Sequence, residues 1–89
     1  MQFVFDSAKH ELDRAKHVVS LALAEVLFDG KHVKLADDRF AYGEKRMIAF
    51  GKVGLSVFAC VFTDRGVPRR IISLRKANSR EVKRYGNAL

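Results

Sequence analysis

The segment from Leu55 to Phe62 is almost entirely apolar and has turn residues on both sides. An apolar run of this length between two turns is typical of a central strand that is covered on both faces. The turns, Gly51–Gly54 and Asp64–Pro68, are short. The segments beyond them, Glu44–Phe50 and Arg69–Arg75, are therefore predicted to pair with this strand as antiparallel neighbours.

Helices are expected before and after these strands along the chain. The pattern predicts a first helix over Ser7–Lys16 and a second, buried helix over Leu21–Phe28 that Ser20 caps. Asn78, with Glu81 three residues later, resembles a capping box at the start of a final helix.

Two short strands complete the predicted fold. One covers Phe3–Phe5, and in the other Val33 and Leu35 alternate with Lys34. The fold class is therefore α+β, an antiparallel sheet packed against helices in the order β-α-α-β-β-β-β-α. We expect a single domain over residues 1–89, because no linker or low-complexity segment interrupts the chain.

The positive charge lies almost entirely in the last third of the chain. Residues 1–62 carry nine Lys or Arg and eight Asp or Glu, whereas residues 63–89 carry eight and two. A basic surface attracts nucleic acid by neutralising phosphates, whatever the base sequence. RNA is the favoured partner, and a solvated basic face is the plainer alternative.

Other classes of function find less support in the sequence. There is no run of about 18 apolar residues and no signal-peptide pattern, so we expect a cytoplasmic protein without a membrane partner. Cys60, the single cysteine, lies in the apolar run and is expected to be an inert core thiol. The spacing of histidines and glycines matches neither a metal site nor a nucleotide loop, so no cofactor is expected.

The segment Thr63–Lys76 carries the strongest functional signal. Strict alternation would put Arg69, Ser73 and Arg75 on an open face, and Arg70 with Leu74 on the face toward the helices. Arginine donates two parallel hydrogen bonds to phosphate and stays charged at every relevant pH. Several arginines together could hold a scissile phosphate and stabilise the charge that forms when the 2′-hydroxyl of RNA attacks it.

A general acid and base would assist this reaction, and the candidates are His17, Tyr85 and Glu44. Each has a structural alternative. His17 could end the first helix, Tyr85 could be a core tyrosine with its hydroxyl at the rim, and Glu44 could form a local pair with Arg46.

The ordered set of residues is similar to that of the BrnT-type toxins, whose fold resembles that of RelE-type ribonucleases. The matching residues are Phe3-x-Phe5-Asp6-x-x-Lys9, Lys16-His17-x-Val19-Ser20, Glu44-x-Arg46, Gly51, Thr63-x-Arg65, Arg70-Ile-Ile-Ser73, Arg75-x-Ala77, Glu81 and Tyr85. The chain departs from the family pattern at Phe5, Asp13, Val18, Leu74 and Asn78, where the family usually has Trp, Asn, Gly, Ala and Ser or Thr.

The resemblance implies a metal-independent endoribonuclease toxin of a type II toxin–antitoxin system that inhibits translation. It implies a hetero-oligomer with a BrnA-type antitoxin, whose ribbon-helix-helix domain binds operator DNA. The catalytic candidates are Arg65, Arg70, Arg75, His17 and Tyr85. The RNA-binding candidates are Lys16, Arg46, Arg69, Lys76, Arg80, Lys83 and Arg84.

Two other hypotheses use the same basic surface. The domain could bind RNA or an antitoxin without chemistry, or it could be a scaffold that dimerises a DNA-binding partner. Cleavage of RNA in EDTA separates the ribonuclease from both.

Overall fold

The computed structural model describes residues 2–5, 14–38, 43–64, 66 and 68–89, and the side chains in these ranges except those of residues 14–18. The elements are β1 (Phe3–Phe5), α1 (Arg14–Asp29), β2 (His32–Ala36), β3 (Met47–Val53), β4 (Ser56–Thr63), β5 (Arg69–Lys76), α2 (Ser79–Tyr85) and the 3-10 turn η2 (Gly86–Ala88). The α+β class is confirmed.

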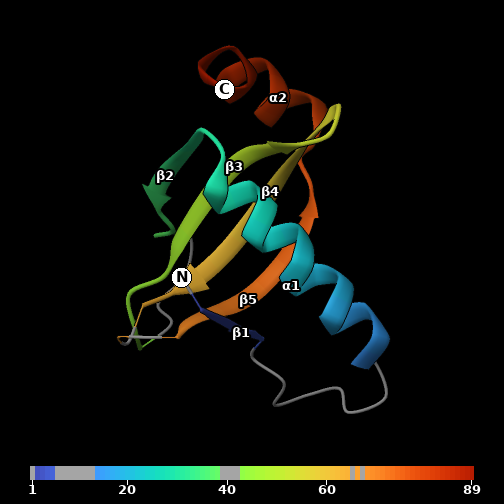
Figure 1. The fold of residues 1–89 in the computed structure, drawn as a ribbon. Coiled ribbons are helices and arrows are strands. Elements are labelled where there is room, and N and C mark those ends of the chain that lie inside the picture. The colour runs from blue at the N-terminus through green and yellow to red at the C-terminus, as the bar shows by residue number, and fades with distance from the viewer. Residues whose placement is uncertain (1, 6–13, 39–42, 65, 67) are drawn as a thin grey trace.

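The five strands form one sheet in the order β1-β5-β4-β3-β2. The predicted hairpins are confirmed, because β2, β3, β4 and β5 pair antiparallel in succession. The expectation of a wholly antiparallel sheet is wrong, since β1 lies parallel to β5 with Phe3 opposite Arg69. Helix α1 crosses one face of the sheet, as Figure 1 shows.

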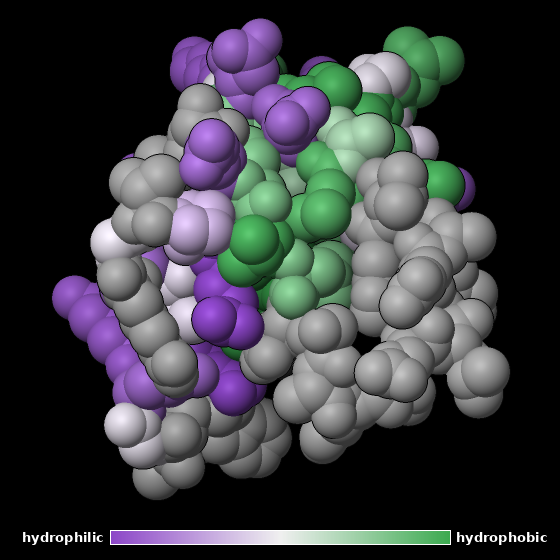
Figure 2. Space-filling model, turned by 60° about the horizontal axis from the view of Figure 1, so that its bottom comes forward, coloured by the Kyte–Doolittle hydropathy of each residue, from purple (hydrophilic) through white to green (hydrophobic). Residues whose placement is uncertain are grey.

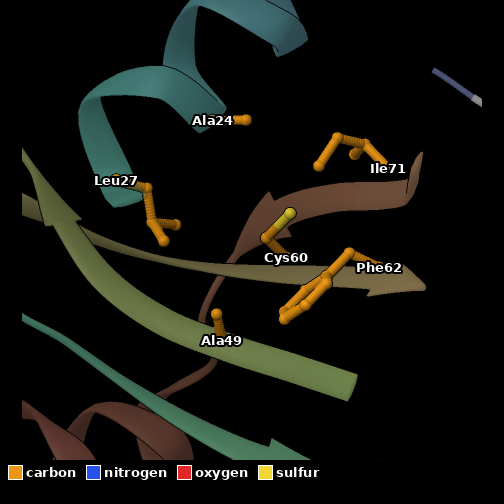
Figure 3. Packing of buried hydrophobic residues seen from close by; sticks show 6 residues of the cluster. All are labelled: Ala24, Leu27, Ala49, Cys60, Phe62 and Ile71. Carbon is orange, nitrogen blue, oxygen red and sulfur yellow. The ribbon is translucent and has the colours of Figure 1, made fainter. Parts of the chain in front are cut away.

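Buried side chains form a cluster on each face of the sheet. The face under α1, here called the α1 face, has a core of Ala24, Leu27, Ala49, Cys60, Phe62 and Ile71. Figure 3 shows these side chains between the helix and the strands. The opposite face, here called the α2 face, has a core of Ile48, Phe50, Val57, Ala59 and Val61, against which Tyr85 of α2 packs. The predicted coverage of β4 on both faces is thus confirmed.

Two glycines allow features that a side chain would obstruct. A Cβ at Gly51 would lie 2.8 Å from Cγ of Leu27, so the missing side chain lets α1 approach β3 closely. Gly54 has a φ of 64° and begins the two-residue turn between β3 and β4. The turn therefore consists of Gly54 and Leu55 instead of the predicted Gly51–Gly54, and β3 and β4 are correspondingly longer. Leu55 is fully exposed in this turn.

The two helices predicted before β2 are replaced by a single one in the described residues. Helix α1 runs without a break from Arg14 through Ser20 to Asp29, so the expected cap at Ser20 is wrong and the order is β-α-β-β-β-β-α. No glycine or proline occurs in this stretch, and one serine inside a helix costs too little to end it. The part of the predicted first helix over residues 7–13 lies outside the described residues.

Strand β5 contains a β-bulge at Ile72. Val61 of β4 pairs with Ser73, but the next residue, Phe62, pairs with Ile71. Two residues of β5 therefore stand opposite one residue of β4, and Ile72 is the extra one. Its side chain packs against the core of the α2 face.

The bulge changes which side chains of β5 share a face. Arg70 pairs with Thr63 on the α2 face, and Arg75 pairs with Ala59 in the core cluster of the same face. The predicted grouping of Arg69 with Ser73 and Arg75 is therefore wrong, because Arg69 lies on the α1 face, over Phe62. Arg70 and Arg75 were expected on opposite faces of the sheet, but both lie on the α2 face.

Neither α1 nor α2, the two α-helices of the described ranges, is both long and apolar enough to cross a membrane.

Candidate active site on the α2 face

Helix α2 begins with the capping box that the sequence predicts. The side-chain oxygen of Asn78 accepts a hydrogen bond from the backbone N–H of Glu81 at 2.8 Å, and the Glu81 carboxylate accepts one from the Asn78 N–H at 2.9 Å. These bonds satisfy donors that a helix start otherwise leaves unpaired. The cap therefore fixes the direction in which α2 leaves β5.

Arg75 is held at this junction by Glu81. Its two terminal nitrogens donate to the two carboxylate oxygens of Glu81 at 2.7 and 2.8 Å. The Arg75 side chain remains 41% exposed, whereas that of Glu81 is only 17% exposed. The pair thus fixes the orientation of the Arg75 guanidinium at the surface, with its terminal fork engaged by the Glu81 carboxylate.

Tyr85 packs on the same face of the sheet as Arg75. Its ring stacks on Phe50 with the centroids 4.4 Å apart. In the sheet, Phe50 pairs with Ala59, and Ala59 pairs with Arg75. Arg75 and the aromatic pair therefore flank one small side chain, Ala59. The prediction of a tyrosine packed on the core is confirmed, and its hydroxyl role stays a prediction.

Arg70 and Arg46 belong to the other end of the α2 face. Arg70 pairs with Thr63, four residues along β4 from the partner of Arg75. At about 3.3 Å per residue, this separates the two backbone positions by about 13 Å. Arg46 precedes β3, and its Nε donates to Glu44 Oε1 at 3.3 Å, so the predicted local pair is confirmed. The arginines of this face therefore form two groups.

Arg69 lies on the other side of the sheet. Its guanidinium is within 4.8 Å of the Phe28 ring centroid and 4.3 Å of that of Phe62. Nε and Nη2 donate to the two carboxylate oxygens of Asp64 at 2.7 and 3.0 Å. The side chain is 9% exposed. Arg69 thus closes the α1-face core over two aromatic rings, a contact that strand alternation did not predict.

The remaining RNA-binding candidates with described side chains are exposed. They are Lys76 at the end of β5 and Arg80, Lys83 and Arg84 on α2. The guanidinium carbon of Arg84 lies 5.6 Å from the centroid of the Tyr85 ring. Helix α2 therefore adds positive charge next to Arg75.

Three candidates cannot be placed in either group. Arg65 lies outside the described residues, and the side chains of Lys16 and His17 are not described. The backbone of residues 16 and 17 belongs to α1, which packs on the α1 face. The catalytic set contains two proton-transfer candidates, His17 and Tyr85. Of these two, only Tyr85 has a described side chain, and it lies on the α2 face.

Sequence reasoning missed a cavity of about 260 Å³ beside α2. Its lining includes Asp37 and Asp38 at the end of β2, together with Arg80, Arg84 and Tyr85 of α2. The consecutive carboxylates after a short strand were the available signal, but the sequence did not show that α2 would lie opposite them.

Figure 2 shows the surface from another side, where hydrophobic residues gather in the middle of the view next to hydrophilic ones.

Cys60 takes no part in this face. The residue is fully buried on the α1 face, and its burial raises the pKa of the thiol to about 12 although the Arg69 charge acts in the opposite direction. The prediction of a core thiol is confirmed, and the raised pKa supports its expected inertness because the thiolate is the reactive form.

Residues 5–81 match the family model described as the ribonuclease toxin BrnT of a type II toxin–antitoxin system. The match covers most of the chain. The chain belongs to the BrnT family. Comparisons with curated proteins and with solved structures found no match.

Membership in the BrnT family decides the general activity. BrnT proteins are ribonuclease toxins, so RNA is the substrate and the partner is a cognate antitoxin. The match includes Arg70 and Arg75 on β5 and ends at Glu81, the partner of Arg75. Tyr85 lies beyond it.

Proposed function

We propose that this BrnT protein is a metal-independent endoribonuclease that cleaves RNA on the α2 face and thereby inhibits translation. The observation that carries the proposal is the Arg75 guanidinium, which Glu81 orients at the surface, across Ala59 from the Phe50 ring on which Tyr85 stacks. Oriented donors that need no rearrangement during the reaction stabilise developing negative charge most effectively.

In the proposed reaction Arg75 binds the scissile phosphate. The 2′-hydroxyl of the preceding ribose loses its proton and attacks phosphorus, and the 5′-oxygen of the next nucleotide leaves and takes up a proton. The products are a 2′,3′-cyclic phosphate and a 5′-hydroxyl. The Tyr85 hydroxyl is the proposed proton-transfer group on this face, and the role of His17 remains a prediction.

Arg70 and Arg46 bind the RNA backbone away from the cleaved bond. The backbone of Arg70 lies about 13 Å from that of Arg75 along the strand direction, which suits a neighbouring phosphate better than the same one. The charges of Arg80, Lys83 and Arg84 attract the strand toward α2. The predicted similarity to the RelE-type fold remains a prediction.

The test is incubation of the purified protein with RNA in EDTA. Cleavage is expected to continue, to give the cyclic phosphate, and to stop when the ribose at the cut carries a 2′-O-methyl group. Arg75→Ala is expected to lower the rate on the order of 10²-fold. Lys31→Ala is a suitable control, because Lys31 is exposed between α1 and β2. Cleavage that is lost in EDTA, or unchanged in Arg75→Ala, contradicts the proposal.

We infer in addition that the antitoxin is of the BrnA type, with a ribbon-helix-helix domain through which the hetero-oligomer binds operator DNA. Support comes from the BrnT family match, since a type II toxin has a protein antitoxin. Co-purification of the toxin with the product of a short neighbouring gene, and specific binding of the complex to the DNA upstream, test this inference.

A further inference from the structure

The cavity between α2 and the end of β2 has no ligand in the reaction described above, although Tyr85 is part of its lining. It has a volume of about 260 Å³. Side chains of Leu35, Ile48 and Phe50 form an apolar floor, and the ring of Tyr85 stands on Phe50. An apolar, partly aromatic surface of this kind suits the flat face of a nucleobase.

Charged groups of opposite sign border this floor. Arg80, Arg84 and Glu81 line it from α2, and the Glu81 carboxylate is paired with Arg75. Asp37 and Asp38 approach from the end of β2. A nucleotide has the complementary features, because its phosphate is anionic and the edge of its base carries N–H donors. The arginines would face the phosphate side, and the carboxylates would face the base edge.

The carboxylates restrict which base can bind. Ionised Asp only accepts hydrogen bonds, so the base must present donors. Guanine is the one RNA base with two neighbouring donors, N1–H and the N2 amino group, on its pairing edge, and these match the two oxygens of one carboxylate. Uracil presents a single N–H between two carbonyl oxygens, which a carboxylate repels.

From these observations we propose that the cavity is a subsite that selects guanine in the RNA substrate, with Asp38 as the accepting group. The proposal rests on the ribonuclease function proposed above and adds the base preference of that site. Tyr85 contributes to both sites, because it borders the cavity and stacks on Phe50, which lies across Ala59 from Arg75. A guanine bound here is therefore held close to the proposed cleavage position.

The first experiment measures the binding of GMP and UMP to the purified full-length protein by NMR titration or calorimetry. GMP is expected to bind about tenfold more tightly, the discrimination that a good two-bond contact to a base provides. Asp38→Asn is expected to weaken GMP binding about tenfold without weakening UMP binding, because the amide turns one acceptor into a donor. Asp38 is exposed, so folding should survive the substitution.

A matched control is Asp29→Asn. Asp29 is exposed at the end of α1 and does not border this cavity. Its substitution removes the same charge and should leave GMP binding unchanged. Equal affinity for the two nucleotides, or equal losses in Asp38→Asn and Asp29→Asn, would overturn the guanine subsite.

Sequencing of RNA product ends separates this inference from the proposed function. Cleavage with a fixed guanine near the cut, relaxed by Asp38→Asn, supports both. Cleavage without any preference for guanine leaves the ribonuclease function standing and overturns the subsite. If no RNA is cleaved, the proposed function fails, and the GMP titration still decides whether the cavity binds guanine.

Discussion

Arg75 and Glu81 are joined by two parallel hydrogen bonds, and the same Glu81 carboxylate caps the start of α2. One acidic side chain therefore connects the strand that carries the candidate phosphate-binding arginine with the helix that carries Tyr85. The orientation of Arg75 depends on the start of this helix.

Replacing Arg75 by Lys keeps the positive charge and removes the planar fork. Lysine cannot bond both Glu81 oxygens in this geometry and also offer a fork to phosphate, so we expect RNA cleavage to fall on the order of 10²-fold. The measurement is the single-turnover rate in EDTA. Arg84→Lys, on the exposed side of α2, should change the rate much less. Equal rates for both variants would show that only charge matters.

Replacing Arg69 by Met keeps the apolar stem and removes two charged hydrogen bonds to Asp64. We expect the free energy of unfolding to decrease by about 1.5–3 kcal/mol, measured in urea. Arg80→Met, at an exposed position, should change it by less than about 0.5 kcal/mol. Because the Arg69 charge is buried and paired, the salt dependence of RNA binding by the folded variant should match the parent. A smaller salt slope would instead support the prediction that Arg69 binds phosphate.

Replacing Gly51 by Ala puts a methyl group 2.8 Å from Leu27 Cγ. The crowding is expected to lower the free energy of unfolding by about 1–3 kcal/mol. In a Leu27→Ala background the same change should cost far less, so the two substitutions should be non-additive in a double-mutant cycle. Gly30→Ala is the control, because its Cβ would make only an ordinary contact at 3.6 Å. Additive losses would contradict the close approach of α1 to β3.

The Cys60 thiol should make stability fall in alkaline solution. Its pKa is about 12 in the folded chain, against an ordinary value of 9.0. Between these values only the unfolded chain releases the proton, so rising pH favours unfolding by up to about 1.4 kcal/mol per pH unit. Urea titrations at about pH 8 and about pH 10 should show a larger loss for the parent than for Cys60→Ala. Equal losses would mean that the thiol is accessible in the folded state.

The local features of this fold are predictable from adjacent residues. The capping box needs only Asn78 and Glu81, and the antiparallel strands follow from short turns and an apolar run. The turn between β3 and β4 was predicted at the wrong residues because Gly51 resembles a turn residue. Its actual role is to make room for Leu27. A single sequence does not show which of these two reasons applies.

The arrangement of the arginines depends on long-range contacts. The bulge at Ile72 arises from how β5 fits against β4, and it moves Arg75 onto the face of Arg70. Strict alternation cannot reveal a bulge, because the residues around it carry no distinctive signal. The position of α2 opposite Asp37 and Asp38 likewise depends on the whole sheet.

The parallel pairing of β1 with β5 has a consequence for synthesis. Phe3 is made first, but its partner Arg69 follows 66 residues later. Loop closure over such a distance is slow, and the sheet cannot be completed until the arginine-bearing strand has left the ribosome. A nascent chain therefore cannot complete the sheet face that carries Arg70 and Arg75 before β5 has been made.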